Sequence, residues 1–496
     1  MSVSLLLEMA ASSFPDREAV VDGSTRLTVD RLDKFANAGA GVVARSGAQH
    51  VCYVGTGGLL LPLLIFASAR AAVPMTPLNY RLGGDAVRRL IERLPDVFII
   101  ADNEFRDVMP GLGKHVMTSD EFVTAAETAE PAEKFADPDD VAVVLFTSGT
   151  TSQPKAVEIT HNNLMSYITG TIEFGSAAPE DTTLIAVPPY HIAGVGAALS
   201  NLYAGRRMVY LRQFDPREWI RLVKAESVAT ATVVPTMLNR IVSLLQTEPT
   251  DLPSLRHLAY GGSKTPLPLI RTALELLPDV GFANAYGLTE TSSTIAVLTP
   301  QDHREAFNAA KDEQRRRLSS VGQPVPGIEV QIRSNDGTVV GPGQTGELYV
   351  RGPQVSGNYT DVGSALDENG WFPTKDVASV DEAGYLYLGG RSDDTIIRGG
   401  ENIAPAEIED VLVEHPGVRE VAVVGAEDPE WGQIIVAVVV PVTSATPDPD
   451  ELRNFVRGNL RGSRTPDRIV FREELPTNAT GKILRREIVR QLDAVG

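Results

Sequence analysis

Cysteine is nearly absent from the sequence, and basic residues are fewer than acidic ones. The single cysteine, Cys52, cannot close an intramolecular disulfide, and its apolar setting HVCYVG favours a buried strand thiol over a nucleophile. This cysteine usage fits a reducing, cytoplasmic location. The 45 basic residues against 64 acidic ones give a net charge of -19, which disfavours nucleic acid and anionic membranes as partners.

Long hydrophobic runs are also absent. The most apolar stretch, residues 59–73, contains Pro62 and Arg70 and is shorter than the roughly 20 residues of a membrane-spanning helix. We therefore expect a core helix there. The N-terminal stretch lacks the basic segment that begins a secretory signal peptide, so we expect no signal peptide there. Neither apolar stretch is expected to span a membrane.

Strand-like runs alternate with helical apolar spacing along the first two thirds of the 496 residues. HVCYVG and VFII belong to a first series, and a second series runs from DVAVVLFTSGT through TTLIAVPPYH to HLAYGGS. This alternation predicts two α/β subdomains with parallel sheets, at about 1–165 and 166–318. Ligands of such sheets bind at the carboxyl ends of the strands.

The character of the sequence changes after about residue 320. Short strands between Asp-Gly, Pro-Gly and Gly-Pro turns predict a β-rich subdomain, a small β-barrel, at 319–391. From residue 394 to 496, helix, strand, strand and helix follow one another and predict a small α+β domain. The chain therefore divides near Arg391 to Asp394, after a large N-terminal domain at 1–391.

The stretch LFTSGTTSQPKAV, at 145–157, concentrates hydroxyl residues directly after a predicted strand. Its hydroxyls and backbone N–H groups can surround an anion, and Lys155 adds a positive charge. It is not a Walker A loop, because the GxxxxGKS/T pattern is absent. Composition alone supports a phosphate clamp and a polar surface turn equally.

The stretch NAYGLTE, at 284–290, places an aromatic ring, a hydroxyl and a carboxylate within five residues. These groups suit base stacking, phosphate contact and Mg²⁺ coordination, respectively. As an isolated string the pattern is weak, since a turn with a solvated glutamate is the commoner case.

These two stretches and six others resemble, in the same order, the motifs of the acyl-adenylating superfamily, which includes acyl-CoA synthetases, luciferases and nonribosomal peptide adenylation domains. The others are PPYHIAG, YGGS, GELYVRGP, GWFPTKD, GRSDDTIIRGGENIAPAEIE and PTNATGKILRRE. The resemblance covers nearly the whole chain. It implies an AMP-forming acyl-CoA synthetase of the fatty-acid–CoA ligase type, with a carboxylic acid, ATP, Mg²⁺ and CoA as its ligands.

The resemblance also implies nucleotide contacts. The first loop would close over the β- and γ-phosphates of ATP, and YGGS would lie beside the adenine. Tyr286 would stack on the base, Thr289 would contact the α-phosphate and Glu290 would hold Mg²⁺. Asp376 and Arg391 match residues that bind the ribose. The implied nucleotide-binding residues are Thr147, Ser148, Gly149, Thr150, Thr151, Lys155, Gly261, Gly262, Ser263, Tyr286, Gly287, Thr289, Asp376 and Arg391.

The implied catalytic residues are Lys482, His191 and Glu290. Lys482 resembles a lysine placed between the acyl carboxylate and the α-phosphate, where its charge offsets the repulsion between two anions. His191 matches a histidine that borders the acyl carboxylate, and a satisfied core histidine explains it nearly as well. Asp393 matches a hinge at 392–393, about which the mobile C-terminal domain would swing between an adenylating and a thioester-forming pose.

The acceptor thiol is less well defined. Gly399 and Gly400 would line the passage for a pantetheine arm, and Trp431 resembles a tryptophan that contacts the CoA nucleotide. RGSRTPDRIVF lacks the aromatic-Lys-x-Pro pattern that often precedes its strand, which weakens the assignment of CoA. Because the sequence ends 14 residues after Lys482, we expect a separate acceptor, either CoA or a free-standing acyl carrier protein.

The acid is predicted to be a plain carboxylic acid. The run IAGVGAALSNLYAG after His191 is small and apolar, and PPYHIAG lacks the aspartate that binds an amino group. Open alternatives are an acyl-ACP or fatty acyl-AMP ligase, an aryl-acid or malonate CoA ligase in which Arg206 and Arg207 bind a second carboxylate, and a noncatalytic nucleotide sensor. The oligomeric state also stays open, a homodimer included.

Three residues depart from the family motifs. Ser152 and Ala156 stand where glycine is usual, so a positive φ at either position would strain or reshape the phosphate loop. Lys375 likewise replaces a glycine directly before Asp376.

Overall fold

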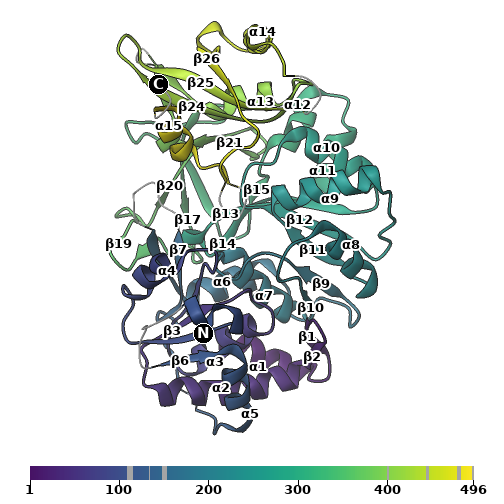
Figure 1. The fold of residues 1–496 in the computed structure, drawn as a ribbon, viewed down its shortest axis with the longest axis vertical. Coiled ribbons are helices and arrows are strands. Elements are labelled where there is room, and N and C mark those ends of the chain that lie inside the picture. The colour runs from purple at the N-terminus through teal and green to yellow at the C-terminus, as the bar shows by residue number, and fades with distance from the viewer. Residues whose placement is uncertain are drawn as a thin grey trace.

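The computed structural model describes residues 1–108, 115–132, 134–147, 154–398, 401–442, 446–477 and 482–493. Figure 1 shows two α/β halves, in purple-blue and teal, and a smaller C-terminal part in yellow-green at one end of the long axis. None of the described helices is both long and apolar enough to cross a membrane. The mixed α/β architecture with a smaller C-terminal domain is confirmed.

The first sheet has nine strands and is mostly parallel from β13 to β1. In sheet order they are β15 (Gln323–Pro324), β14 (Ser293–Leu298), β13 (Gly281–Leu288), β12 (His257–Gly261), β11 (Thr230–Val233), β9 (Thr182–Ile185), β10 (Arg207–Tyr210), β1 (Glu18–Asp22) and β2 (Thr25–Thr28). Its helices are α8 (Pro216–Ala225), α9 (Pro235–Thr247), α10 (Leu267–Leu276), α11 (Pro300–Asn308) and α12 (Asp312–Arg315). Trp219 of α8, Leu238 of α9 and Phe282 of β13 are buried together in the core of this half.

The second sheet has eight strands. In sheet order they are β19 (Gly363–Ser364), β18 (Asn358–Tyr359), β8 (Lys155–Thr160), β7 (Val141–Thr147), β4 (Met75–Leu78), β3 (His50–Val54), β5 (Val97–Ala101) and β6 (Val116–Thr118). Cys52 is fully buried in β3, as predicted. The predicted core helix is α3 (Leu60–Arg70), which is buried along its whole length.

A shared hydrophobic core joins the two sheets, since it contains Val20 and Met208 from the first sheet and Val51 and Val143 from the second. Its helices include α1 (Ser4–Ser13), α2 (Val29–Ser46), α5 (Ser119–Thr128), α6 (His161–Thr171) and α7 (Ile192–Ala204); α4 (Gly84–Ile91) packs in a separate core beside β5. The loops at the carboxyl ends of both sets of strands are thereby held close together.

The β-rich unit is a four-stranded antiparallel sheet of β16 (Glu329–Arg333), β17 (Thr345–Arg351), β20 (Phe372–Val380) and β21 (Leu386–Arg391). It corrects our expectation of a small barrel, because β16 and β21 are the two edges of this sheet and do not pair in the described structure. Two further strands of this part of the chain, β18 and β19, extend the second sheet instead.

The C-terminal part packs helices on a three-stranded sheet of β24 (Val418–Asp428), β25 (Gly432–Pro441) and β26 (Arg468–Phe471). A hairpin of β22 (Ile396–Arg398) and β23 (Glu401–Ile403) precedes it. The helices are α13 (Pro405–Leu412), α14 (Pro449–Asn459) and α15 (Arg485–Asp493). α13 lies against β21, so this part covers the edge of the four-stranded sheet.

Candidate active site

Three predicted residues from separate strands meet in what we call the Asp376 cluster, which comprises Tyr286, Asp376 and Arg391. Asp376 on β20 lies opposite Arg391 on β21 in the strand register. Arg391 Nη1 lies 3.4 Å from Asp376 Oδ1 and donates to the Thr374 carbonyl at 3.1 Å. The hydroxyl of Tyr286, at the end of β13, donates to Asp376 Oδ2. Strand pairing therefore places an acceptor, a cation and an aromatic ring in one corner.

The electrostatics of the Asp376 cluster involve the C-terminal part of the chain. Burial raises the pKa of Asp376, and the charges of Arg391 and Lys482 and the hydrogen bond from Tyr286 oppose that rise. The exposed Lys482 therefore lies near enough to act on Asp376. Burial and the neighbouring carboxylate raise the pKa of Tyr286 well above its ordinary value, which keeps this hydroxyl protonated as a donor.

Lys375, directly before Asp376, has a strained backbone. Its φ is 65°, in the left-handed region that favours glycine, the residue usual at this position of the motif. Its Nζ lies 3.7 Å from Glu347 Oε1 on the neighbouring strand. By contrast, Ala156 lies in β8 opposite Phe146 and has no positive φ, so its replacement of glycine causes no strain. Ser152 lies outside the described residues.

A second group of contacts links the first loop to the NAYGLTE stretch. Thr289 and Glu290 form the short helix η2 (Thr289–Thr291) at the end of β13. The Tyr359 hydroxyl donates to Glu290 Oε1 at 3.0 Å, and the Lys155 ammonium lies over the Tyr359 ring, 5.0 Å from its centroid. The strand register places Thr147 opposite Lys155. The predicted phosphate-loop residues Ser148, Gly149, Thr150 and Thr151 lie outside the described residues.

Tyr359 was missed at the sequence level. It lies in β18, which pairs with β8, and only this pairing brings it beside Lys155 and Glu290. The one available signal was an aromatic residue with a polar group in the turn-rich segment SGNYT. Its contacts depend on a partner 69 positions away, which local pattern cannot show.

Glu290 is the carboxylate that would hold Mg²⁺. Across the described ranges, no group of three or more His, Cys, Asp or Glu side chains gathers in a way that could hold a metal ion. A single carboxylate fits Mg²⁺, which keeps several waters and is commonly bound by one or two carboxylates together with substrate phosphates.

The glycines of two motifs are required by close backbone approach. A methyl group at Gly261 would lie 2.2 Å from the Ala285 carbonyl oxygen, and one at Gly287 would lie 1.7 Å from the Ser293 carbonyl oxygen. Gly262 has a φ of 86°. The YGGS loop, including Ser263, and the turn after Tyr286 therefore lie side by side at the ends of β12 and β13.

His191 precedes α7, and its Nε2 is buried without a hydrogen-bond partner in the described structure. Burial, with a further contribution from the charge of Arg81, lowers the pKa of His191 to about 4, so the ring is neutral near pH 7. The centroids of the Tyr190 and His191 rings lie 4.5 Å apart, and the buried hydroxyl of Tyr190 also has no hydrogen-bond partner in the described structure. The described residues therefore supply no hydrogen-bond partner for Nε2 of His191.

The start of α7, directly after His191, carries small residues. A methyl group at Gly196 would lie 3.4 Å from Tyr167 Cε1 and 3.6 Å from Ser293 Oγ. Ala193 and Ala197 are only partly buried on the same helix. α7 and Ser293 of β14, which follows the NAYGLTE stretch, thus approach each other.

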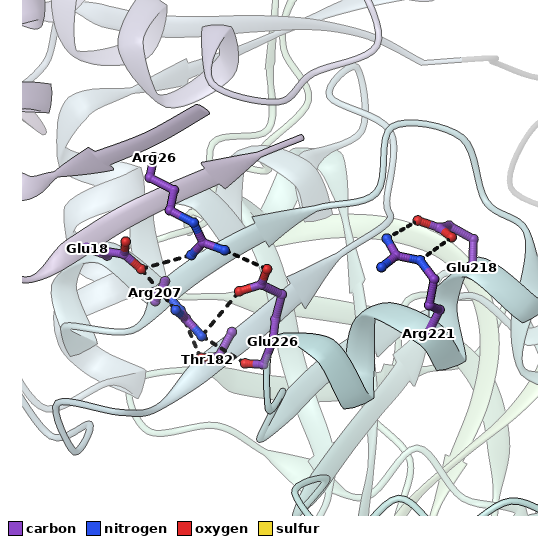
Figure 2. A network of polar contacts seen from close by, with 7 residues as sticks. All are labelled: Glu18, Arg26, Thr182, Arg207, Glu218, Arg221 and Glu226. Atoms are coloured by element: carbon purple, nitrogen blue, oxygen red, sulfur yellow. Dashed lines mark hydrogen bonds and ion pairs between the residues drawn. The ribbon is translucent and has the colours of Figure 1, made fainter. Parts of the chain in front are cut away.

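Arg206 and Arg207 lie at the amino end of β10 in the first sheet, away from the carboxyl ends of the strands. Arg207 pairs with Glu18 at 2.9 Å and with Glu226 at 3.5 Å, and its Nε donates to Thr182 Oγ1 at 3.1 Å. These contacts are drawn in Figure 2. Thr182 and Arg207 begin β9 and β10, whose carboxyl ends carry the site loops. Arg206 contacts Asn201 Oδ1 at 3.4 Å. These contacts correct the suggestion that the two arginines bind a second carboxylate.

The remaining predicted residues lie in the C-terminal part. Asp393 is in the 3-10 helix η4 (Ser392–Asp394), directly after β21. Trp431 is 45% exposed in the turn between β24 and β25, and the Arg398 guanidinium lies 5.0 Å from its ring centroid. Gly399 and Gly400 lie outside the described residues.

Comparisons with known proteins agree with this geometry. The profile of the "AMP-binding enzyme" family matches residues 7–360, and that of the "AMP-binding enzyme C-terminal domain" matches residues 407–482. The second match ends at Lys482. The first match contains the motifs from FTSGTTSQPKAV to GELYVRGP, whereas GWFPTKD and most of GRSDDTIIRGGENIAPAEIE lie between the two matches.

Named relatives match over nearly their whole length. A feruloyl-CoA synthase of Amycolatopsis sp is 33% identical over 494 residues, covering 96% of each chain. The fatty acid–[acyl-carrier-protein] ligase ScoC of Streptomyces coeruleorubidus is 31% identical over 492 residues, covering 96% of this chain and 93% of that protein.

Among solved structures, the o-succinylbenzoate CoA synthetase of Bacillus subtilis in complex with its acyl-adenylate intermediate has a TM-score of 0.85 and 29% identity, covering 97% of both chains. Likeness over such a length shows common ancestry of the whole chain. This chain belongs to the AMP-binding enzyme family and is an AMP-forming acid–thiol ligase.

Proposed function

We propose that this chain is an acyl-CoA synthetase that adenylates a carboxylic acid with MgATP and then transfers the acyl group to the thiol of CoA. The observation that carries the proposal is the Asp376 cluster with Lys482 near it. A nucleotide-binding module without chemistry has no use for a lysine delivered to this place from another part of the chain. The retained lysine therefore disfavours a noncatalytic sensor.

The first half-reaction joins two anions. A carboxylate oxygen of the acid attacks the α-phosphorus of ATP, the bond to the β-phosphate oxygen breaks, and pyrophosphate leaves. Lys482 lies between the two anions and offsets their repulsion, an electrostatic effect commonly worth several kcal/mol. Asp376 accepts hydrogen bonds from the ribose hydroxyls and Arg391 orients it, while neutral His191 borders the acid carboxylate.

The remaining nucleotide contacts come from the loops at the strand ends. Tyr286 stacks on the adenine beside Gly261, Gly262 and Ser263, with Gly287 allowing the turn. Thr289 contacts the α-phosphate. Lys155 and Thr147, with the loop residues Ser148, Gly149, Thr150 and Thr151, bind the outer phosphates. Glu290 would hold Mg²⁺, which neutralises phosphate charge when bound.

The second half-reaction uses the same site with the C-terminal domain in another pose. The thiol sulfur attacks the acyl carbonyl carbon, AMP leaves and the thiol proton goes to solvent. We propose a domain division into 1–391 and 394–496, with the hinge at 392–393 and Asp393 as the residue that rotates. Trp431 contacts the CoA nucleotide, and Gly399 and Gly400 line the path of the pantetheine arm.

The acid is an apolar monocarboxylate bound along α7. Ala193, Gly196 and Ala197 present only small side chains on α7 after His191, which favours an apolar acid such as a fatty acid. An aryl acid is the second candidate, because the relatives include a feruloyl-CoA synthase and an o-succinylbenzoate CoA synthetase. A carrier protein is the second candidate acceptor, because ScoC is named as an acyl-carrier-protein ligase.

Pyrophosphate release across a panel of acids tests the proposal. The panel contains acids from acetate to palmitate, benzoates, cinnamates and malonate, each with CoA or with a pantetheinylated carrier protein. We expect release of pyrophosphate and AMP with an apolar monocarboxylate, thioester formation with CoA, and no activity with malonate. Thioester formation with the carrier protein alone would show that the carrier protein, and not CoA, is the acceptor. Failure of every acid to release AMP would contradict adenylation.

A further inference from the structure

Two consecutive acidic residues of α13 have partners in different parts of the molecule. Glu409 contacts Arg485, which begins α15 in the same domain. Asp410, the next residue, contacts Lys264 in the N-terminal domain. One helix therefore makes ion pairs with the segment that follows Lys482 and with the domain that contains the Asp376 cluster.

The contact between Lys264 and Asp410 crosses from one domain to the other. The Lys264 ammonium donates to Asp410 Oδ2 at 2.6 Å, and the two side chains are 44% and 57% exposed. Lys264 directly follows Ser263 of the YGGS loop. The position of α13 is thereby tied to the loop that we assign to the adenine.

The contact between Glu409 and Arg485 is internal to the C-terminal domain and more buried. Arg485 Nη2 donates to Glu409 Oε2 at 2.9 Å, and its Nη1 donates to the Val423 carbonyl at 2.9 Å. Its Nε lies 3.4 Å from Asp394 Oδ2, directly after the proposed hinge residue. Arg485 is the third residue after Lys482, so these bonds fix the segment carrying Lys482 relative to α13.

We propose that Lys264 and Asp410 are a positioning pair for the adenylation step, which holds α13 and, through Glu409 and Arg485, the Lys482 segment over the nucleotide cleft. This inference rests on the proposed role of Lys482. Rotation of the C-terminal domain separates Lys264 from Asp410, so the pair stabilises the adenylating pose alone. Neither residue touches the reacting atoms.

The expected effect is small because the pair is exposed. Exposed ion pairs contribute up to about 1 kcal/mol, so loss of this one should shift the balance between the two poses by up to about fivefold. Salt should reduce the effect, since exposed charges are screened at high ionic strength.

The experiment measures both half-reactions in the full-length variants Asp410→Asn and Lys264→Ala. Acid-dependent ATP–pyrophosphate exchange should fall by up to about fivefold in kcat with little change in the KM for ATP, because the nucleotide contacts are intact. Thioester formation from presynthesised acyl adenylate should be unchanged or faster. At high salt the wild-type exchange rate should approach that of the variants.

Two further variants make the test specific. The charge-exchanged double variant Lys264→Asp/Asp410→Lys should recover most of the exchange rate, which loss of a merely structural residue would not allow. Glu218→Gln removes a surface carboxylate paired with Arg221 within α8, shown in Figure 2, and should leave both half-reactions unchanged.

The positioning role of Lys264 and Asp410 would be overturned if Asp410→Asn lost both half-reactions equally, or if it lost no pyrophosphate exchange at low salt. It would also be overturned if the double variant folded but recovered none of the exchange rate. A wild-type chain without acid-dependent exchange would instead overturn the proposed function. An active wild type that is inactivated by Lys482→Ala but indifferent to Asp410→Asn would overturn the positioning pair alone.

Discussion

The two sides of the candidate site are held in place by different kinds of interaction. Tyr286, Asp376 and Arg391 come from strands whose ends are fixed by sheet pairing and by direct hydrogen bonds. Lys482 comes from a separate domain, which is tied to the N-terminal domain by the exposed pair of Lys264 and Asp410 and by packing of α13 on β21. The nucleotide side is thus preformed, whereas the position of the lysine depends on weak contacts that can be broken and remade.

The largest difference between the two sides should appear on removal of the lysine. Lys482→Ala is expected to reduce acid-dependent pyrophosphate exchange on the order of 10²- to 10³-fold, because the positive charge between the two reacting anions is lost. Thioester formation from presynthesised acyl adenylate should survive. Arg486→Ala, which removes a neighbouring exposed cation, is the control and should keep both activities. Equal loss of both half-reactions in Lys482→Ala would contradict the role assigned.

Removal of the carboxylate tests the preformed side. Asp376→Asn should raise the KM for ATP on the order of 10- to 100-fold, since hydrogen bonds to a charged group contribute about 1.5–3 kcal/mol. Burial raises the pKa of Asp376, so a neutral side chain should be tolerated by the fold. Glu329→Gln, in the same sheet, loses a surface pair with Arg351 and should not change KM. An unchanged KM in Asp376→Asn would exclude ribose binding there.

The proposed hinge at 392–393 would connect the two sides. Proline fixes φ within the range typical of a 3-10 helix such as η4, so Asp393→Pro should slow thioester formation by about tenfold more than adenylation. Asp393→Ala removes the same side chain without restricting the backbone and should affect both steps alike. Rapid single-turnover assays of each half-reaction measure the difference. Unaltered thioester kinetics in the proline variant would place the rotation elsewhere.

The smallest effect concerns stability. Lys375→Gly should raise the free energy of unfolding by about 1 kcal/mol, because glycine adopts a φ of 65° without the penalty of a Cβ atom. The exposed contact with Glu347 offsets this gain by less than about 1 kcal/mol. Lys375→Ala retains the Cβ and should show no gain. Thermal unfolding of wild type and the two variants measures these differences in stability. A gain in stability in Lys375→Ala would refute backbone strain at this position.

Local sequence predicted the strands, the loops after them and the residue types of the site. Asp376 and Arg391 were identified from separate motifs, and the direct pairing of their strands brings them together. Pairings between distant strands were not predictable, because they depend on long-range register. Thus β1 joins β10 in the first sheet, and β18 joins β8 and brings Tyr359 to Glu290.

The sequence showed where a motif glycine is replaced, but it could not show whether the backbone there has a positive φ. Ala156 and Lys375 both replace glycine in a motif and both lie in strands, but only Lys375 has a left-handed φ. The contact of Lys264 with Asp410 joins residues 146 positions apart, across a boundary whose geometry no local pattern contains.

The close approach at Gly287 restricts how this enzyme can diversify. A single added methyl group would meet the Ser293 carbonyl oxygen at 1.7 Å, so laboratory evolution toward new acids cannot proceed through this turn without loss of the fold around Glu290. At Gly196 on α7 an added methyl group would meet only side-chain atoms, at 3.4 Å or more, although one at Gly194 would lie 2.5 Å from the Pro188 carbonyl oxygen. Libraries for altered acid preference should therefore be concentrated on that helix.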